Sequence, residues 1–206
     1  MITDEAFRHF SDLQSLHMAL WGESMITDRA FRHVSNLQSL EMWTCHRLAI
    51  TDAAFSHLSN FLFLDMPGCN QPMITDGAFQ HLWKLQFLGI NGCNQSTITD
   101  EAFHHLWKLQ SLRMQQCNQS TITDETFRHL SNLQSLRMQN CNQSTITSEA
   151  FRHLSNLECL FMSDTTRAID KTKHCVICRI CGPSKLIGNW GNIRSLLGEW
   201  YLSTLR

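Results

Sequence analysis

Histidine is the first residue type whose spacing suggests chemistry in this sequence. One histidine recurs every 24 residues, and a column of imidazoles could build a metal or proton array. The column comprises His9, His33, His57, His81, His105, His129 and His153. A ladder of parallel side chains does not converge on one ion, and a metal site also needs carboxylates or carbonyls that orient its ligands. We therefore expect structural or surface histidines, and no cofactor.

A second candidate site is a cysteine run near the carboxyl end of the chain. Cys175, Cys178 and Cys181 form a Cys-x-x-Cys-x-x-Cys pattern that is similar to part of an iron–sulfur or zinc run. Only His174 or Cys159 could complete a set of four ligands. We interpret the run as a chance cluster outside the repeats. A metal- or redox-responsive protein stays open as the alternative function.

Catalytic arrangements have weaker support. Serine, histidine and aspartate are abundant, but they recur with the repeat, so any apparent triad would occur several times over. The nine glycines are scattered and form no phosphate-binding loop, and no nucleophile motif stands apart. We predict that the protein is not an enzyme and has no small-molecule substrate.

Composition and charge exclude further classes. The 206 residues are 43% hydrophobic, and 17 Lys and Arg against 18 Asp and Glu give a formal net charge of −1. This is the composition of a globular domain, without the basic excess that nucleic acid usually requires. No apolar run approaches the roughly 18 residues of a membrane span, and a polar segment follows Met1 where a signal peptide would be apolar. We expect no nucleic-acid partner and no membrane.

Five of the nine cysteines follow the repeat interval: Cys45, Cys69, Cys93, Cys117 and Cys141. Residues in equivalent positions form a ladder of small apolar side chains and not a set of disulfide pairs. Reduced thiols are typical of intracellular proteins. We therefore predict an intracellular, cytoplasmic protein.

The repeat itself decides the fold. Ile-Thr-Asp begins at Ile2, Ile26, Ile50, Ile74, Ile98 and Ile122, and returns as Ile-Thr-Ser at Ile146. Phenylalanine, leucine and methionine columns follow the same interval, which means that each unit packs on its neighbours. A unit this small cannot bury its own apolar face, so stacking is obligatory.

Two periodicities alternate within each unit. In the sixth unit, residues 124–130 have helical spacing with Asp124 as a suitable N-cap, and residues 133–138 alternate as a half-buried strand does. Residues 142–145 supply turn chemistry. Each unit is thus predicted to be strand, turn, helix and turn, with the strands aligned in a parallel sheet.

These residues resemble a known repeat family. Leu133-Gln-Ser-Leu136-Arg-Met138-Gln-Asn-Cys141, followed by Ile146-Thr, resembles the leucine-rich repeat consensus, most closely its cysteine-containing subtype. The resemblance covers residues 2 to about 164. The sequence departs from it in the helix phenylalanines, in methionine at the third leucine position, and in Trp21 where the first cysteine would stand. The resemblance implies an α/β solenoid, a curved horseshoe with the parallel sheet on its concave face and short helices on its convex face.

The period is lost after Met162, so we assign residues 1–164 to the solenoid and 165–206 to a non-repeat tail. Nothing between Asp164 and Gly191 indicates regular structure, whereas apolar residues from Ile193 to Leu205 have helical spacing and predict a capping helix over 192–205. Met1 lies inside a repeat, so a truncated fragment of a longer array is a further alternative.

In such a solenoid the strand residues between the buried ones point out from the concave face. The resulting binding residues are Glu41, Trp43, Phe63, Asp65, Phe87, Asn91, Arg113, Gln115, Arg137 and Gln139. Acids lie toward the amino-terminal half and arginines toward the carboxyl-terminal half, with an aromatic cluster of Trp43, Phe63 and Phe87. Exposed aromatics with flanking arginines are typical of interface hot spots. The competing interpretation is drift of solvent positions after duplication.

The predicted function is a non-catalytic interaction module that binds a protein or peptide on this face. The resemblance suggests a narrower role as the substrate-recognition part of a ubiquitin-ligase adaptor, because the cysteine-containing subtype often follows an F-box. The sequence leaves no room for an F-box before Ile2.

Overall fold

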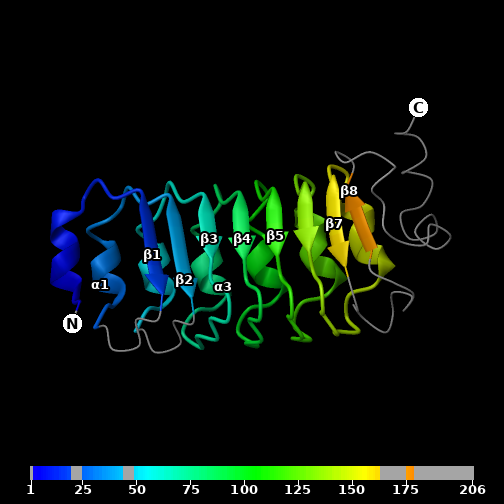
Figure 1. Cartoon of the computed structure of the whole chain (residues 1–206), viewed down its shortest axis with the longest axis horizontal. Helices are drawn as coiled ribbons and strands as arrows, with labels where there is room; N and C mark the ends of the chain where they lie inside the picture. Colours follow the sequence, from blue (N-terminus) through cyan, green and yellow to red (C-terminus); the bar gives the residue numbers. More distant parts are fainter. Residues whose placement is uncertain (1, 20–24, 44–48, 163–174, 179–206) are drawn as a thin grey trace.

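The computed structural model describes residues 2–19, 25–43, 49–162 and 175–178. The repeats form a row, with strands along one side and short helices behind them (Figure 1). The strands are β1 (Ser15–Ala19), β2 (Ser39–Trp43), β3 (Phe63–Asp65), β4 (Phe87–Gly89), β5 (Ser111–Arg113), β6 (Ser135–Arg137), β7 (Cys159–Met162) and β8 (Cys175–Cys178). The helices are η1 (Asp4–His9), α1 (Asp28–Phe31), α2 (Asp52–Phe55), α3 (Asp76–Phe79), η2 (Asp100–Phe103), η3 (Asp124–His129) and η4 (Ser148–His153), where η marks a 3-10 helix.

Strands β1 to β7 pair in chain order, and every pair is parallel. Their register matches equivalent positions, as where Leu40 pairs with Leu64 and Leu64 pairs with Leu88. A column in the sequence is therefore also a column in space. This arrangement confirms the predicted α/β solenoid with its parallel sheet on one side and its short helices on the other. The row is nearly straight in Figure 1, without the predicted horseshoe curvature.

The core lies between the sheet and the helices, where the repeated apolar columns meet. Phe103 from η2, Leu112 from β5 and Ile98 from the preceding turn are all fully buried, and the equivalent residues of neighbouring repeats continue each column. Burying a side chain of this size contributes about 1.5–3 kcal/mol relative to leaving it in water. Because each unit buries its columns against the next, the repeats stabilise one another.

The helix start differs from the prediction. Thr123, and not Asp124, is the N-cap, and its Oγ1 accepts a hydrogen bond from the Glu125 backbone N–H at 3.2 Å. The Asp124 carboxylate instead reaches the next repeat, where it accepts from the backbone N–H and the Oγ1 hydroxyl of Thr147, both at 2.6 Å. A threonine in extended conformation precedes each helix, and its side chain caps the helix in every repeat except the first. Threonine is among the preferred N-cap residues, so the aspartate is left for the neighbouring unit.

The same pair of bonds joins every described pair of neighbouring repeats. The pairs are Asp4 with Thr27, Asp28 with Thr51, Asp52 with Thr75, Asp76 with Thr99, Asp100 with Thr123 and Asp124 with Thr147, at 2.6 to 2.8 Å. We call this column the Asp–Thr ladder. Serine replaces aspartate only at Ser148, in the last unit of the sequence repeat. The sequence therefore keeps an aspartate wherever a further repeat follows.

The cysteine column is a second inter-repeat ladder. Cys93, Cys117 and Cys141 are buried, and each thiol donates to a backbone carbonyl of the preceding unit, at 3.1 Å to Met66, 3.0 Å to Ile90 and 2.8 Å to Met114. Burial raises the pKa of the Cys93 thiol to about 12 and that of Cys141 to about 11. These thiols are therefore protonated at neutral pH, which suits packing and not nucleophilic chemistry. Cys45 lies outside the described residues.

Strand β8 corrects the prediction that residues 164 to 191 form no regular structure. It pairs antiparallel with β7, with Cys178 opposite Cys159 and Cys175 opposite Met162. An edge strand presents a row of unpaired backbone groups, and β8 supplies partners for them. The tail shows no repeat periodicity, so the repeat pattern did not predict this strand. The predicted capping helix over 192–205 lies outside the described residues.

Within the described ranges, no helix is long and apolar enough to cross a bilayer.

Candidate functional site

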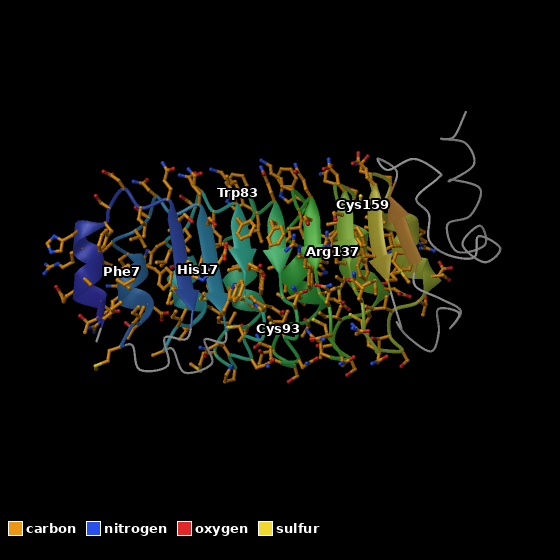
Figure 2. The ribbon with its side chains drawn as sticks, in the orientation of Figure 1. Phe7, His17, Trp83, Cys93, Arg137 and Cys159 are labelled. Atoms are coloured by element: carbon orange, nitrogen blue, oxygen red, sulfur yellow. The ribbon has the colours of Figure 1, made fainter. Side chains whose placement is uncertain are left out.

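The candidate site is the outward surface of strands β1 to β7, which we call the sheet face. Figure 2 shows His17 and Arg137 on this surface. Cys93 lies away from it, at the edge of the row where the strands end. At its centre Phe63 on β3 and Phe87 on β4 are register partners, and their rings stack at 4.2 Å between centroids with an angle of 8°. Both side chains are half-buried. The stack is a flat apolar platform in a face that is otherwise polar.

Trp43 does not join this platform. It lies four residues beyond Ser39, the register partner of Phe63, which is roughly 13 Å along a strand. Its ring instead packs beside His17, at 5.6 Å between centroids, and its side chain is 46% exposed. The predicted cluster of three aromatics is therefore two separate contacts, because Trp43 and the phenylalanines belong to different outward columns of the strands.

Acidic residues lie on the amino-terminal side of the platform. Glu41 and Asp65 are register partners on β2 and β3, and His17 Nδ1 lies 2.8 Å from Glu41 Oε2. The Asp65 carboxylate leans over Gly89 of the next strand, where an added Cβ would lie 2.0 Å from Asp65 Oδ1. Gly89 thus provides the space for this carboxylate to turn toward Arg113.

Arginines lie on the other side. Arg113 and Arg137 are register partners on β5 and β6. The guanidinium of Arg113 lies over the Phe87 ring at 4.9 Å, and that of Arg137 lies over Phe161 at 4.5 Å. A guanidinium over an aromatic face is attracted by the ring quadrupole, which offsets the repulsion between two like charges on adjacent strands. The predicted charge gradient along the sheet face is present in the structure's geometry.

The family comparison agrees with the repeat architecture. The model for the BspA-type leucine-rich repeat region, which contains six copies of the repeat, matches residues 1–95 and 48–175. The chain belongs to this leucine-rich repeat family. The family-level resemblance is confirmed, whereas the cysteine-containing subtype stays a prediction.

Solved structures show the same fold. The leucine-rich repeat protein TLR13, in its complex with ssRNA13, matches with a TM-score of 0.64 and 22% identity, over 80% of this chain and 24% of the TLR13 chain. A chain of the Drosophila Toll–Spatzle complex matches with a TM-score of 0.57 and 16% identity, over 84% of this chain and 27% of that one. This leucine-rich repeat chain thus spans about a quarter of each structure. None of the curated proteins matches its sequence.

The predicted amide residues of the leucine-rich repeat array bond mainly to one another. Asn91 Oδ1 accepts from the Gln115 backbone N–H at 2.9 Å, and Gln115 Nε2 donates to Gln139 Oε1 at 2.8 Å. These bonds join three successive repeats along the sheet face. Asn91, Gln115 and Gln139 therefore hold the face in shape, and part of their hydrogen-bonding capacity is already used.

The pKa of Asp65 is raised above its ordinary value. Burial is the main cause, Arg113 opposes the shift and Glu41 adds to it. Asp65 Oδ1 and Arg113 Nε are both buried, and neither has a hydrogen-bond partner within the described part of the chain. The carboxylate is thus attracted by Arg113 without a bond that would offset its lost hydration.

We expect Asp65→Asn to be more stable than the unchanged protein at pH 7 but not at pH 3. A carboxyl whose folded-state pKa is raised binds its proton more tightly in the folded state, so its ionisation lowers stability as pH rises from the unfolded value through the raised folded one. Because Asp65 is only half-buried, solvent screening limits the gain to less than about 1 kcal/mol, a Tm shift of at most roughly 2–4 °C. Thermal unfolding at both pH values tests this expectation, with Asp12→Asn on an exposed loop as control. An equal gain at both pH values would contradict it.

The sequence reasoning missed one surface feature. Trp83 and Trp107 occupy a column that is serine in the other five repeats, and lysine follows each of them. Their side chains are 42% and 49% exposed. Figure 2 shows Trp83 at the edge of the row where the strands begin. The signal was available, because two adjacent repeats depart from the consensus in the same two columns.

The other candidates contribute less to a site. Of the cysteine run, Cys175 and Cys178 lie on β8, whereas Cys181 and His174 fall outside the described residues. Within the described ranges, no three His, Cys, Asp or Glu side chains converge as metal ligands would. In the histidine column, the His129 ring lies 4.4 Å from that of His104, and partial burial with this neighbour lowers the pKa of His129. His9, His129 and His153 are the last residues of η1, η3 and η4, so these imidazoles lie on the helix side of the row.

Proposed function

We propose that this array is a non-catalytic binding module whose sheet face takes a protein or peptide segment. The observation that carries the proposal is the Phe63–Phe87 stack, which stands half-exposed between an acidic pair and an arginine pair. Aromatic rings that leave a face open to water gain most when a partner covers them. The core columns already account for the fold, so the fold does not require phenylalanine at these two outward positions.

The charges give the partner an orientation. A basic side chain fits beside Glu41 and Asp65, an apolar or aromatic side chain fits on the phenylalanine platform, and an acidic side chain fits beside Arg113 and Arg137. A segment running from β2 toward β6 therefore carries its positive charge first and its negative charge last. Such complementarity selects among partners more than it adds affinity.

A protein partner fits this face better than nucleic acid does. The TLR13 structure holds ssRNA13 and the Toll structure holds Spatzle, so chains of this fold occur in complexes with either kind of macromolecule. Here the net charge is −1, and Glu41 and Asp65 would repel phosphate on half of the face. The proposal therefore keeps a protein or peptide partner. The absence of catalysis is part of the proposal.

Two narrower statements belong to the proposal. The protonated, buried thiols of Cys93, Cys117 and Cys141 support an intracellular, reducing compartment. A role as the substrate-recognition part of a ubiquitin-ligase adaptor rests only on the resemblance to the cysteine-containing subtype.

Selection from a library of random twelve-residue peptides displayed on phage tests the proposal. We expect enriched peptides with an aromatic residue between a basic residue and an acidic residue. Phe87→Ala removes half of the stack and the ring beneath Arg113, so it should weaken the best peptide about ten- to thirty-fold, as at an interface hot spot. Fluorescence anisotropy with the labelled peptide measures this change.

Ser15→Ala is the matched control, because Ser15 occupies the same outward column as Phe87 at the other end of the array. It should leave the affinity unchanged. Charge reversal by Glu41→Lys should weaken the binding of the selected peptides through repulsion of their basic residue. If the enriched peptides bind Phe87→Ala as tightly as the unchanged protein, the platform is not the binding site and the proposal is wrong.

A further inference from the structure

A second surface stands apart from the sheet face. Trp83 and Lys84 lie between α3 and β4, and Trp107 and Lys108 lie between η2 and β5. We call these four residues the Trp–Lys edge. Each tryptophan stands four residues before the first residue of its strand, at the edge where the strands begin. The two pairs occupy neighbouring repeats, so the four residues form one continuous surface.

The fold does not require these residues. In four of the other five repeats the second position is asparagine, and in the first it is Asp12. The asparagine Nδ2 donates to the carbonyl of the preceding repeat, as from Asn132 to Trp107 at 2.8 Å and from Asn156 to Ser131 at 2.9 Å. A lysine in this column replaces that short amide bond; Lys84 Nζ instead donates to Asn60 Oδ1 at 2.7 Å. Lys84 thus keeps a hydrogen bond between repeats, and the substitutions place a half-buried cation beside each exposed indole.

The lysines and indoles interleave. Lys108 Nζ lies 4.7 Å from the centroid of Trp107 and 5.2 Å from that of Trp83, and Lys84 Nζ lies 4.9 Å from Trp83. Lys108 therefore contacts the rings of both repeats. These cation–π contacts restrict flexible side chains, so less conformational entropy is lost when a ligand binds.

The positive charge of the edge is not neutralised. Within the described residues, neither lysine has a carboxylate within 4.0 Å, the limit for an ion pair, and two acids of the following helices have other partners. Glu101 lies 3.0 Å from His104 Nδ1, and Glu125 pairs with Arg128 at 2.6 Å. The edge therefore presents two indoles and two cations that pair with no carboxylate of the described residues.

We propose that the Trp–Lys edge is a second docking site, which takes an acidic peptide segment of a protein partner. Two Asp or Glu side chains of that segment pair with Lys84 and Lys108, and an apolar or aromatic side chain between them packs on the indoles. The opposite charge selects the ligand, and the tryptophans supply the buried contact area. This site is independent of the sheet face and of the function proposed for it.

Charge counting favours peptide over single-stranded RNA. An RNA strand carries one phosphate per nucleotide, and its affinity depends on how many of these charges the protein neutralises. The edge offers two unpaired cations in a chain of net charge −1. Two carboxylates match that number, whereas a run of phosphates exceeds it.

The indole N–H signals of the full chain, recorded by ¹⁵N NMR, provide the test. The chain has six tryptophans, and Trp83→Phe and Trp107→Phe assign the two signals of the edge. The probe is the acetylated, amidated peptide Glu-Phe-Glu-Leu-Glu. We expect saturable shifts of both signals. Lys84→Glu with Lys108→Glu should weaken the binding at least about ten-fold through loss of both charge pairs.

Arg29→Glu with Arg32→Glu is the matched control, because it makes the same change in net charge on the exposed surface of the second repeat. This variant should bind the probe as the unchanged chain does. The peptide Lys-Phe-Lys-Leu-Lys should shift neither signal, and a ten-nucleotide uridine RNA should bind more weakly than the acidic probe.

Three results would overturn the proposal: no shift of the Trp83 and Trp107 signals, equal binding by the lysine-reversed variant, or tighter binding of the RNA. The remaining indole signals and the circular dichroism spectrum report whether each variant is folded. Phe87→Ala should leave this binding unchanged, which separates the edge from the sheet face.

Discussion

Replacing Asp100 with alanine is expected to lower the free energy of unfolding by about 3 kcal/mol, because a charged acceptor contributes roughly 1.5–3 kcal/mol for each hydrogen bond it accepts. The Asp100 carboxylate accepts from the backbone N–H of Thr123 at 2.8 Å and from its hydroxyl at 2.7 Å, and the Thr126 hydroxyl also donates to it. Alanine leaves the half-buried Thr123 and the buried Thr126 without their acceptor. Urea denaturation followed by circular dichroism measures the loss.

The position of Asp100 adds a second expectation. In a repeat protein, stability is approximately the sum of the stabilities of single repeats and of the interfaces between neighbours. Asp100 lies in the fifth repeat and Thr123 in the sixth, so the substitution weakens one interface. We expect the unfolding transition to broaden as the two sides of that interface uncouple.

Glu101→Ala is the control for Asp100→Ala. Glu101 is the next residue of η2, is exposed, and contacts His104 at the surface. Surface pairs of this kind contribute little, so the control should change stability by less than about 0.5 kcal/mol. Comparable losses in the two variants would show that charge near the helix start, and not the Asp–Thr ladder, stabilises the array. Asp100→Asn keeps one acceptor oxygen and should fall between the two.

The Asp–Thr ladder also shows where sequence reasoning stopped. The interval of 24 residues predicted the repeat, the strands and their in-register pairing. Identical units that must each bury one face do so by stacking with equivalent residues in contact. The aspartate was assigned to the helix of its own unit, where an N-cap is the common role. Its actual partner lies 23 residues away, and only the stacked geometry brings the two together.

The sequence pattern predicted which residues point outward from the strands, but it did not distinguish their positions along the strand. The pattern correctly put Phe63, Phe87 and the paired charges on the outward side of the strands. It joined Trp43 to them because the outward columns were considered together, although the first and the third are roughly 13 Å apart along a strand. The Trp–Lys edge was visible as a double departure from the consensus. It lay in a loop position, where sequence variation alone does not indicate function.

Phe79→Ala is expected to have the largest effect on stability in this set. Phe79 ends α3, is 1% exposed, and belongs to the phenylalanine column between the helices and the sheet. Truncating a buried phenylalanine removes its transfer free energy and leaves a cavity, which together cost about 3–5 kcal/mol. Neighbouring repeats fix the space around the ring, so the cavity has little room to collapse. Urea denaturation should show the midpoint falling accordingly.

Phe87→Ala in the same repeat is the matched comparison, because it removes the same atoms from the outward side of β4. Its ring is half-buried and stacks on Phe63, so the expected loss of stability is only about 1 kcal/mol. The same substitution should weaken binding of the selected peptide about ten- to thirty-fold. Phe79→Ala should leave that affinity nearly unchanged wherever the array is still folded. If Phe87→Ala were instead the more destabilising of the two, the phenylalanine platform would be part of the core. The main observation that supports a partner on the sheet face would then be lost.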